Sequence, residues 1–122
     1  MDAPFTMPVS TFWAWLIRHN NCILRAACPE ASLFDDESFH WHFAGETDGI
    51  QVVQVVQGKR LIGELFIETE KVAYVQAVPS ENGQEHTFEL ISETETERTA
   101  AYVFVMVHPY GEDLPASESG IH

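Results

Sequence analysis

The first pronounced hydrophobic pattern in the chain predicts a short helix near the N-terminus. Apolar side chains recur there at the spacing of one face of an α-helix. They are Phe12, Trp13, Leu16 and Ile17. Ser10 or Thr11 suits the N-cap position, and we expect the helix to extend to about His19. Trp15 lies off this face, so the helix is either buried on two sides or exposes one indole ring.

From Cys22 onward, runs rich in Val, Ile, Phe and Tyr alternate with turn sequences about every twelve residues. The turn sequences are Asp48-Gly49, Gly58-Lys59, Glu70-Lys71, Asn82-Gly83 and the tract 94–98. Their glycines suit hairpin turns that need a positive φ. The pattern predicts an α+β fold, with the short N-terminal helix packed on a curled antiparallel meander of about six strands. Residues 22–26 are a candidate seventh strand.

The alternation of polar and apolar positions predicts which strand faces meet solvent. In 85–93, Phe88 and Leu90 should point inward, and the glutamates of that run should point outward. The runs 51–57 and 100–107 are apolar on both faces. One short helix cannot cover all of this surface, so we expect either a strongly curled sheet or a homodimer.

Composition indicates one compact domain. The chain has 122 residues, a formal charge of −13 and 45% hydrophobic residues, which is too apolar for a disordered protein. We expect an extended arm over 1–8, a single domain over 1–110 and a disordered acidic tail over 111–122. No signal peptide or membrane-spanning run is evident, and Cys22 and Cys28 fit buried thiols, so we expect a cytoplasmic protein. A disulfide or a metal pair between them is the alternative.

The negative charge is concentrated in the second part of the chain. Residues 46–122 hold fourteen acids and four bases, and 81–97 hold six glutamates and no base. The glutamates are Glu81, Glu85, Glu89, Glu93, Glu95 and Glu97. Such a balance excludes direct binding to nucleic acid or to an anionic membrane. It predicts a docking surface for a basic protein, by imitation of a nucleic-acid backbone, or else an edge that only keeps the domain soluble.

A pair of histidines is the sharpest local feature. If residues 39–44 form a strand, His40 and His42 project to the same face, where both imidazoles can bind one divalent transition metal. Glu46 is a candidate third ligand. The alternative is that both imidazoles are simply hydrogen-bonded to backbone or to acids.

The spacing H-x-H-x3-E resembles the first metal-binding motif of the cupin family. The run 55–58 is similar to the strand and glycine that follow that motif, and Pro79, Gly83 and His86 are similar to the second motif. The resemblance implies a metal-binding or small-ligand-binding β-barrel centred on His40, His42 and Glu46. His86 or His108 would complete the ligand set if their strands fold alongside.

No catalytic set is recognisable in the chain. It lacks a nucleophile elbow and a glycine-rich phosphate loop, and neither cysteine lies in a known catalytic signature. We therefore predict a small, acidic, non-enzymatic interaction protein without a cofactor. The cupin-like metal domain is the second interpretation. An apolar-ligand carrier, with a cavity between the helix and the sheet, is the third.

Overall fold

The computed structural model describes the backbone of residues 5–47, 49–79 and 85–107. The predicted tail over 111–122, the turn at Asn82-Gly83 and Glu81 lie outside these residues. The elements in chain order are β1 (Phe5–Met7), α1 (Val9–Arg18), η1 (Asn20–Cys22), β2 (Ile23–Cys28), β3 (Ala31–Phe34), β4 (His40–Thr47), β5 (Ile50–Gln57), β6 (Arg60–Glu68), η2 (Thr69–Lys71), β7 (Tyr74–Pro79), β8 (Glu85–Glu93) and β9 (Arg98–Val107).

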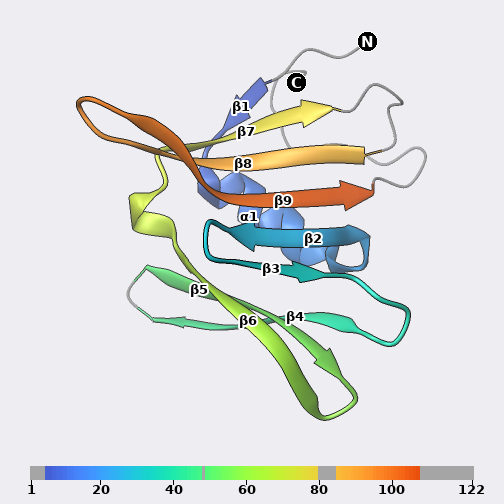
Figure 1. The fold of residues 1–122 in the computed structure, drawn as a ribbon. Helices are drawn as coiled ribbons and strands as arrows, with labels where there is room; N and C mark the ends of the chain where they lie inside the picture. Colours follow the sequence, from blue (N-terminus) through green and yellow to red (C-terminus); the bar gives the residue numbers. More distant parts are fainter. Residues whose placement is uncertain (1–4, 48, 80–84, 108–122) are drawn as a thin grey trace.

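The strands form two antiparallel sheets, which confirms the predicted α+β class (Figure 1). The large sheet has the order β1-β7-β8-β9-β2-β3, and the small sheet has the order β4-β5-β6. The candidate strand at 22–26 is present as β2. The meander is not continuous, however, because η2 carries the chain from the small sheet to the large one. The Glu70-Lys71 turn therefore joins two sheets and does not close a hairpin.

Helix α1 covers the inner face of the large sheet, and it begins earlier than the sequence predicts. Pro8 occupies the N-cap position without a side-chain hydrogen bond, so neither Ser10 nor Thr11 is the cap. Within the predicted extended arm, Phe5–Met7 pair with β7 as strand β1, and the helix starts shortly after them. Pro8 fits this junction because its φ of −67° is already suited to the chain that enters a helix.

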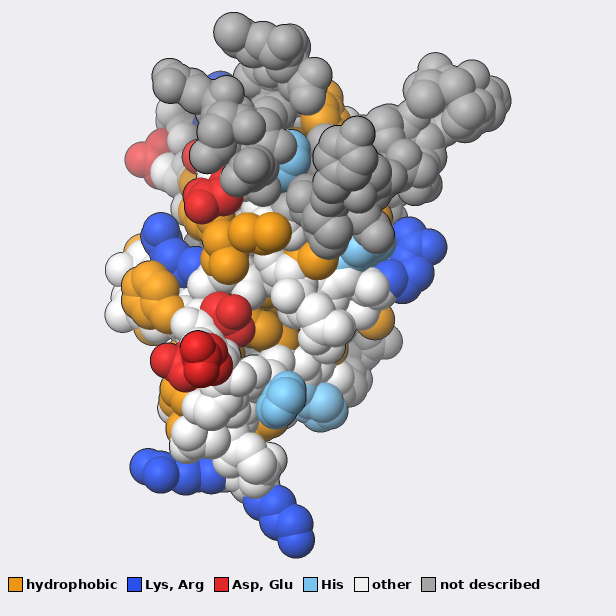
Figure 2. Space-filling view, turned by 90° about the vertical axis from the view of Figure 1, so that its right-hand side faces the viewer, with side chains coloured by type: hydrophobic (Ala, Val, Ile, Leu, Met, Phe, Trp, Pro, Cys, Tyr) orange, Lys and Arg blue, Asp and Glu red, His pale blue; other side chains and the backbone are white. Residues whose placement is uncertain are grey.

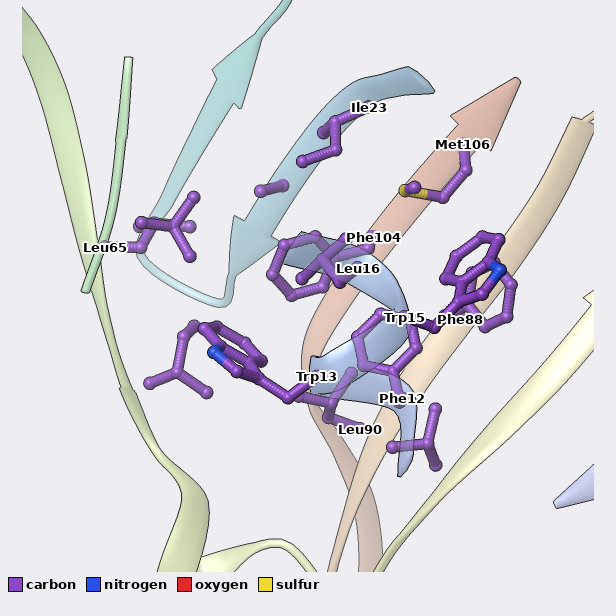
Figure 3. Packing of buried hydrophobic residues seen from close by; sticks show 14 of the residues in the cluster. Phe12, Trp13, Trp15, Leu16, Ile23, Leu65, Phe88, Leu90, Phe104 and Met106 are labelled. Atoms are coloured by element: carbon purple, nitrogen blue, oxygen red, sulfur yellow. The ribbon is translucent and has the colours of Figure 1, made fainter. Parts of the chain in front are cut away.

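Aromatic side chains fill the space between α1 and the two sheets (Figure 3). Phe12 packs on Phe88 and Phe104, with ring centroids 5.0 Å and 5.6 Å apart. Trp13 contacts Phe104 of the large sheet and Phe43 of the small sheet edge to face. Trp15 is fully buried, so the helix is buried on two sides. These rings fill the space between α1 and the large sheet, whereas a pocket of about 370 Å³ lies beside α1, between Trp13 and Ile17 of the helix and Gln51 and Thr69.

Two of the predicted hairpin turns contain a glycine that the structure describes, and both glycines have the positive φ that the sequence predicts. Gly49 has a φ of +82° and Gly58 a φ of +62°, which side chains with a Cβ rarely adopt. Within the described part of the chain, no helix is long and apolar enough to cross a membrane.

Candidate functional site

The predicted row of glutamates lies on the β8–β9 hairpin. Phe88 and Leu90 are fully buried, as predicted, and Glu85, Glu89 and Glu93 alternate with them on the outer face of β8. Glu85 and Glu93 are exposed, and Glu89 is half-buried. Glu95 and Glu97 lie in the turn that follows the strand and are exposed. The row therefore divides into two carboxylates on the sheet face and an acidic turn, by which we mean Glu93, Glu95 and Glu97.

Thr94 holds the acidic turn in one conformation. Its backbone N–H donates to the carbonyl oxygen of Glu97 at 2.8 Å. Its hydroxyl oxygen accepts hydrogen bonds from the backbone N–H groups of Glu97 at 3.0 Å and Thr96 at 3.3 Å. Because the backbone groups are used within the turn, the three carboxylates project from a fixed backbone into solvent.

The acidic turn is not neutralised from within the molecule. Arg98 lies opposite Glu93 in the β8–β9 ladder, but its Nη1 donates to the Tyr74 hydroxyl at 3.0 Å. No base of the described residues forms an ion pair with a carboxylate of the turn. The turn thus presents three negative charges close together in water, where they attract cations over a screening length of about 8–10 Å at ordinary salt.

The two histidines occupy one face, as predicted. His40 and His42 lie on β4, separated by the buried Trp41, and both are exposed on the outer face of the small sheet. Imidazole side chains reach the surface in the lower part of Figure 2, where the small sheet lies.

A hydrogen-bonded row across the small sheet orients His42. Its Nδ1 lies 3.0 Å from Oε1 of Gln54 on β5, and Nε2 of Gln54 donates to Oε1 of Glu64 on β6 at 3.0 Å. These three residues are register partners across the ladder. Since the Gln54 amide nitrogen donates to Glu64, its oxygen must accept, so His42 carries a proton on Nδ1. Its Nε2 points away from this bond and can accept a proton or a metal ion.

The predicted third ligands do not join the pair. The side chain of Glu46 and all of His108 lie outside the described residues. His86 is buried on the inner face of the large sheet, whereas His40 and His42 lie on the outer face of the small sheet. Consequently, no group of three or more metal-ligating side chains exists among the described residues. Pro79 and His86 belong to β7 and β8 of the large sheet, so His86 of the cupin-like pattern does not meet His40 and His42 on the small sheet.

Three residues of the two sheets were not predicted from the sequence to take part in side-chain contacts of interest. Gln54 and Glu64 complete the row with His42, and the signal for Gln54 is one polar residue between valines of β5. Arg25 lies on β2 with its guanidinium carbon 6.0 Å from the ring centroid of Phe34. Its signal is a single base in an otherwise apolar strand.

Known proteins give no guide to these features. No protein family, curated protein or solved structure matches this chain.

Proposed function

We propose that this chain is a small, acidic, non-enzymatic interaction module that binds a basic protein surface through its acidic turn. The observation that carries the proposal is the fixed turn with exposed Glu93, Glu95 and Glu97, none of which is paired with a described base. Because the backbone of the turn is already held by hydrogen bonds, it loses little conformational freedom when it meets a complementary surface. Successive carboxylates along one strand and turn also imitate the charge pattern of a nucleic-acid backbone.

The formal charge of −13 supports this mode of action. A large net charge attracts an oppositely charged partner before contact and accelerates the encounter. We expect such a partner to carry Lys and Arg on the contacting surface. We place the protein in the cytoplasm, since Cys22 and Cys28 form no disulfide.

The direct test is a pull-down with a charge-matched control. The protein should recover basic proteins at low salt and lose them at ~0.5 M salt, where the screening length falls to a few Å. A triple variant with Glu93→Gln, Glu95→Gln and Glu97→Gln should recover much less. The control replaces three exposed acids elsewhere, with Glu30→Gln, Glu37→Gln and Glu70→Gln, and changes the net charge equally. Equal recovery by both triple variants would show that the acidic turn has no specific role.

The oriented His42 supports a second candidate function, which is binding of a divalent transition metal on the small sheet. A metal-ligating histidine usually donates its second ring N–H to an oxygen acceptor, and Gln54 provides that acceptor here. His40 and His42 would bind through their imidazoles, with water completing the coordination.

Addition of Zn²⁺ to chelator-treated protein tests this second function. Wild-type protein should bind about one ion per chain and unfold at a higher temperature, since a ligand that binds only the folded state stabilises it. His42→Ala should abolish the rise in unfolding temperature. Gln54→Leu, which removes only the hydrogen-bond acceptor of His42, should lower the affinity for Zn²⁺ by roughly 10–100-fold. An unchanged melting temperature in wild-type protein would dispose of the metal site.

A further inference from the structure

The pocket of about 370 Å³ beside α1 opens where the helix faces the small sheet. Helix α1 forms one wall with Trp13, Ala14 and Ile17, and Gln51 of β5 and Thr69 of η2 form the other. Figure 3 shows Trp13 on the side of α1 toward the small sheet. Small-molecule sites have volumes of roughly 300–1,000 Å³, so this pocket suits a ligand of one or two rings.

Gln51 is a polar residue at a position that the fold otherwise gives to core residues. Alternate residues of a strand share a face, so Gln51 of β5 points inward together with the buried Val53 and Val55. Its register partner on β6 is Ile67, which is fully buried, whereas Gln51 is half-buried. The inner face of the small sheet therefore ends in an amide at the wall of the pocket.

The polar side chains of the pocket lie at one end of it. Trp13 contacts Phe43 of β4, and Asn20, beyond the end of the helix, donates to the carbonyl oxygen of Trp41 at 3.1 Å. The helix thus runs toward the start of β4, and its first turn lies near the start of β5, because the two strands are antiparallel. The polar end of the pocket has Ser10, Gln51 and Thr69, and the apolar end has Ala14 and Ile17.

The walls of the pocket favour an uncharged ligand. None of the described side chains that line it is ionisable, although the chain has 19 acids and 6 bases. An ion would lose its hydration there without gaining a partner of opposite charge. The Thr69 hydroxyl donates to the carbonyl oxygen of Gly49 at 2.8 Å, so its lone pairs can accept from a ligand. The amide of Gln51 can both donate and accept.

We infer that this pocket binds a small, uncharged and mostly apolar molecule with one hydrogen-bonding group. The apolar part of the ligand lies along Trp13, Ala14 and Ile17, and it covers the side chain of Ile17, which is 48% exposed. The hydrogen-bonding group meets Gln51 and Thr69. For a ligand of this size we expect a dissociation constant on the order of 10 µM. The site is separate from the acidic turn, and neither depends on the other.

The fluorescent probe N-phenyl-1-naphthylamine tests the pocket. It is uncharged, has two aromatic groups and one N–H, and emits more strongly in apolar surroundings. Wild-type protein should raise its fluorescence to saturation. Ala14→Phe places a ring in the pocket and should weaken binding by at least about tenfold. The control Ala31→Phe adds the same ring at an exposed position of β3 and should bind as the wild type does.

Gln51→Leu tests the polar end of the pocket. Leucine is close to glutamine in size but lacks the amide, so the affinity for the probe should fall by roughly 2–10-fold, which is the contribution of one hydrogen bond. The affinity for 1-phenylnaphthalene, which has no hydrogen-bonding group, should not fall. An unchanged affinity for N-phenyl-1-naphthylamine would contradict the role of Gln51.

Three results would overturn the inference. They are the lack of a fluorescence increase with ~100 µM wild-type protein, an Ala14→Phe variant that binds as tightly as wild type, and an equal loss of affinity in Ala31→Phe. Far-UV circular dichroism of each variant shows that the protein is folded. The triple variant of the acidic turn should bind the probe as wild type does, which distinguishes a failure of the pocket from a failure of the proposed function.

Discussion

Single residues determine two of the hairpin turns in this fold. Gly49 and Gly58 both adopt the left-handed region of φ, in turns where the sequence predicts it. The two sites differ in their surroundings. A Cβ at Gly49 would meet the side chain of Glu70 within 2.6 Å, whereas a Cβ at Gly58 would meet nothing within 4 Å. Gly58 therefore isolates the backbone requirement from any effect of packing.

Substitution at Gly58 should measure the cost of the left-handed backbone alone. Gly58→Ala should lower the free energy of unfolding by about 1–2 kcal/mol, the cost of this conformation for a residue with a Cβ. Gly58→Asn should cost less, because Asn tolerates the left-handed region. Urea unfolding of the three proteins gives both values. Equal losses in the free energy of unfolding for Gly58→Ala and Gly58→Asn would show that the left-handed backbone conformation is not the cause of the loss.

At this scale, the sequence predicts the local position of a residue, such as the face of its strand, but not its contacts with residues on other strands. The alternation along β4 was sufficient to place His40 and His42 on one face. The partners of His42 are Gln54 and Glu64, which lie on the next two strands and depend on the register of all three. Strand register is set by turns and packing together, so these contacts could not be read from spacing.

At the scale of elements, α1 is held by its aromatic contacts with both sheets. Phe12 is fully buried between rings of β8 and β9, whereas Ile17 is 48% exposed, although the helical pattern places both on one apolar face. The difference arises because Trp15, on the side of the helix away from Ile17, is also buried. The buried face is therefore centred near Phe12 and Leu16, and Ile17 lies beyond its edge, next to Trp13.

Truncation of these two side chains should therefore have unequal effects. Phe12→Ala should lower the free energy of unfolding by about 3–5 kcal/mol, as expected for a large cavity in a core. Ile17→Ala should change it by less than about 1 kcal/mol, since half of that side chain already contacts water. Urea unfolding followed by circular dichroism compares the two. A large loss in Ile17→Ala would indicate that α1 buries a different face in solution.

The order of elements was predictable from turn chemistry, but the division into sheets was not. Apolar runs separated by turns gave the strands from β4 to β9 in sequence, together with the class of the fold. The break at η2 depends on tertiary packing, because Val72 is buried and the N–H of Ala73 donates to the carbonyl of Ile91 on β8. The local sequence at Glu70-Lys71 would suit a hairpin turn equally well, so it could not predict that the chain changes sheets there.

At the scale of the whole molecule, one core joins both sheets and the helix. The cluster of buried side chains includes Trp41 and Leu65 of the small sheet together with Phe88 and Phe104 of the large sheet. Gly63 of β6 approaches β3 so closely that a Cβ there would lie 2.7 Å from Leu33. The two sheets are therefore parts of one packed unit.

A shared core predicts cooperative unfolding. Urea unfolding followed by tryptophan fluorescence, which reports on Trp13, Trp15 and Trp41, should coincide with unfolding followed by far-UV circular dichroism. A fluorescence transition that comes before the circular dichroism transition would contradict a shared core, because it would show that one part of the molecule unfolds independently of the rest.

The feature of the whole molecule on which the proposed function rests is its distribution of charge. The acidic turn presents three carboxylates from a fixed backbone, and the net charge of −13 adds attraction at longer range. In the proposed function this surface recognises a basic protein.

The association rate with a basic protein recovered at low salt tests the central proposal most directly. Stopped-flow measurement across a range of ionic strength should show that the rate constant falls by at least about tenfold between ~0.05 M and ~0.5 M salt. The triple variant of Glu93, Glu95 and Glu97 to Gln should bind more slowly and show a shallower dependence. A rate constant that is independent of salt in the wild-type protein would contradict the proposal.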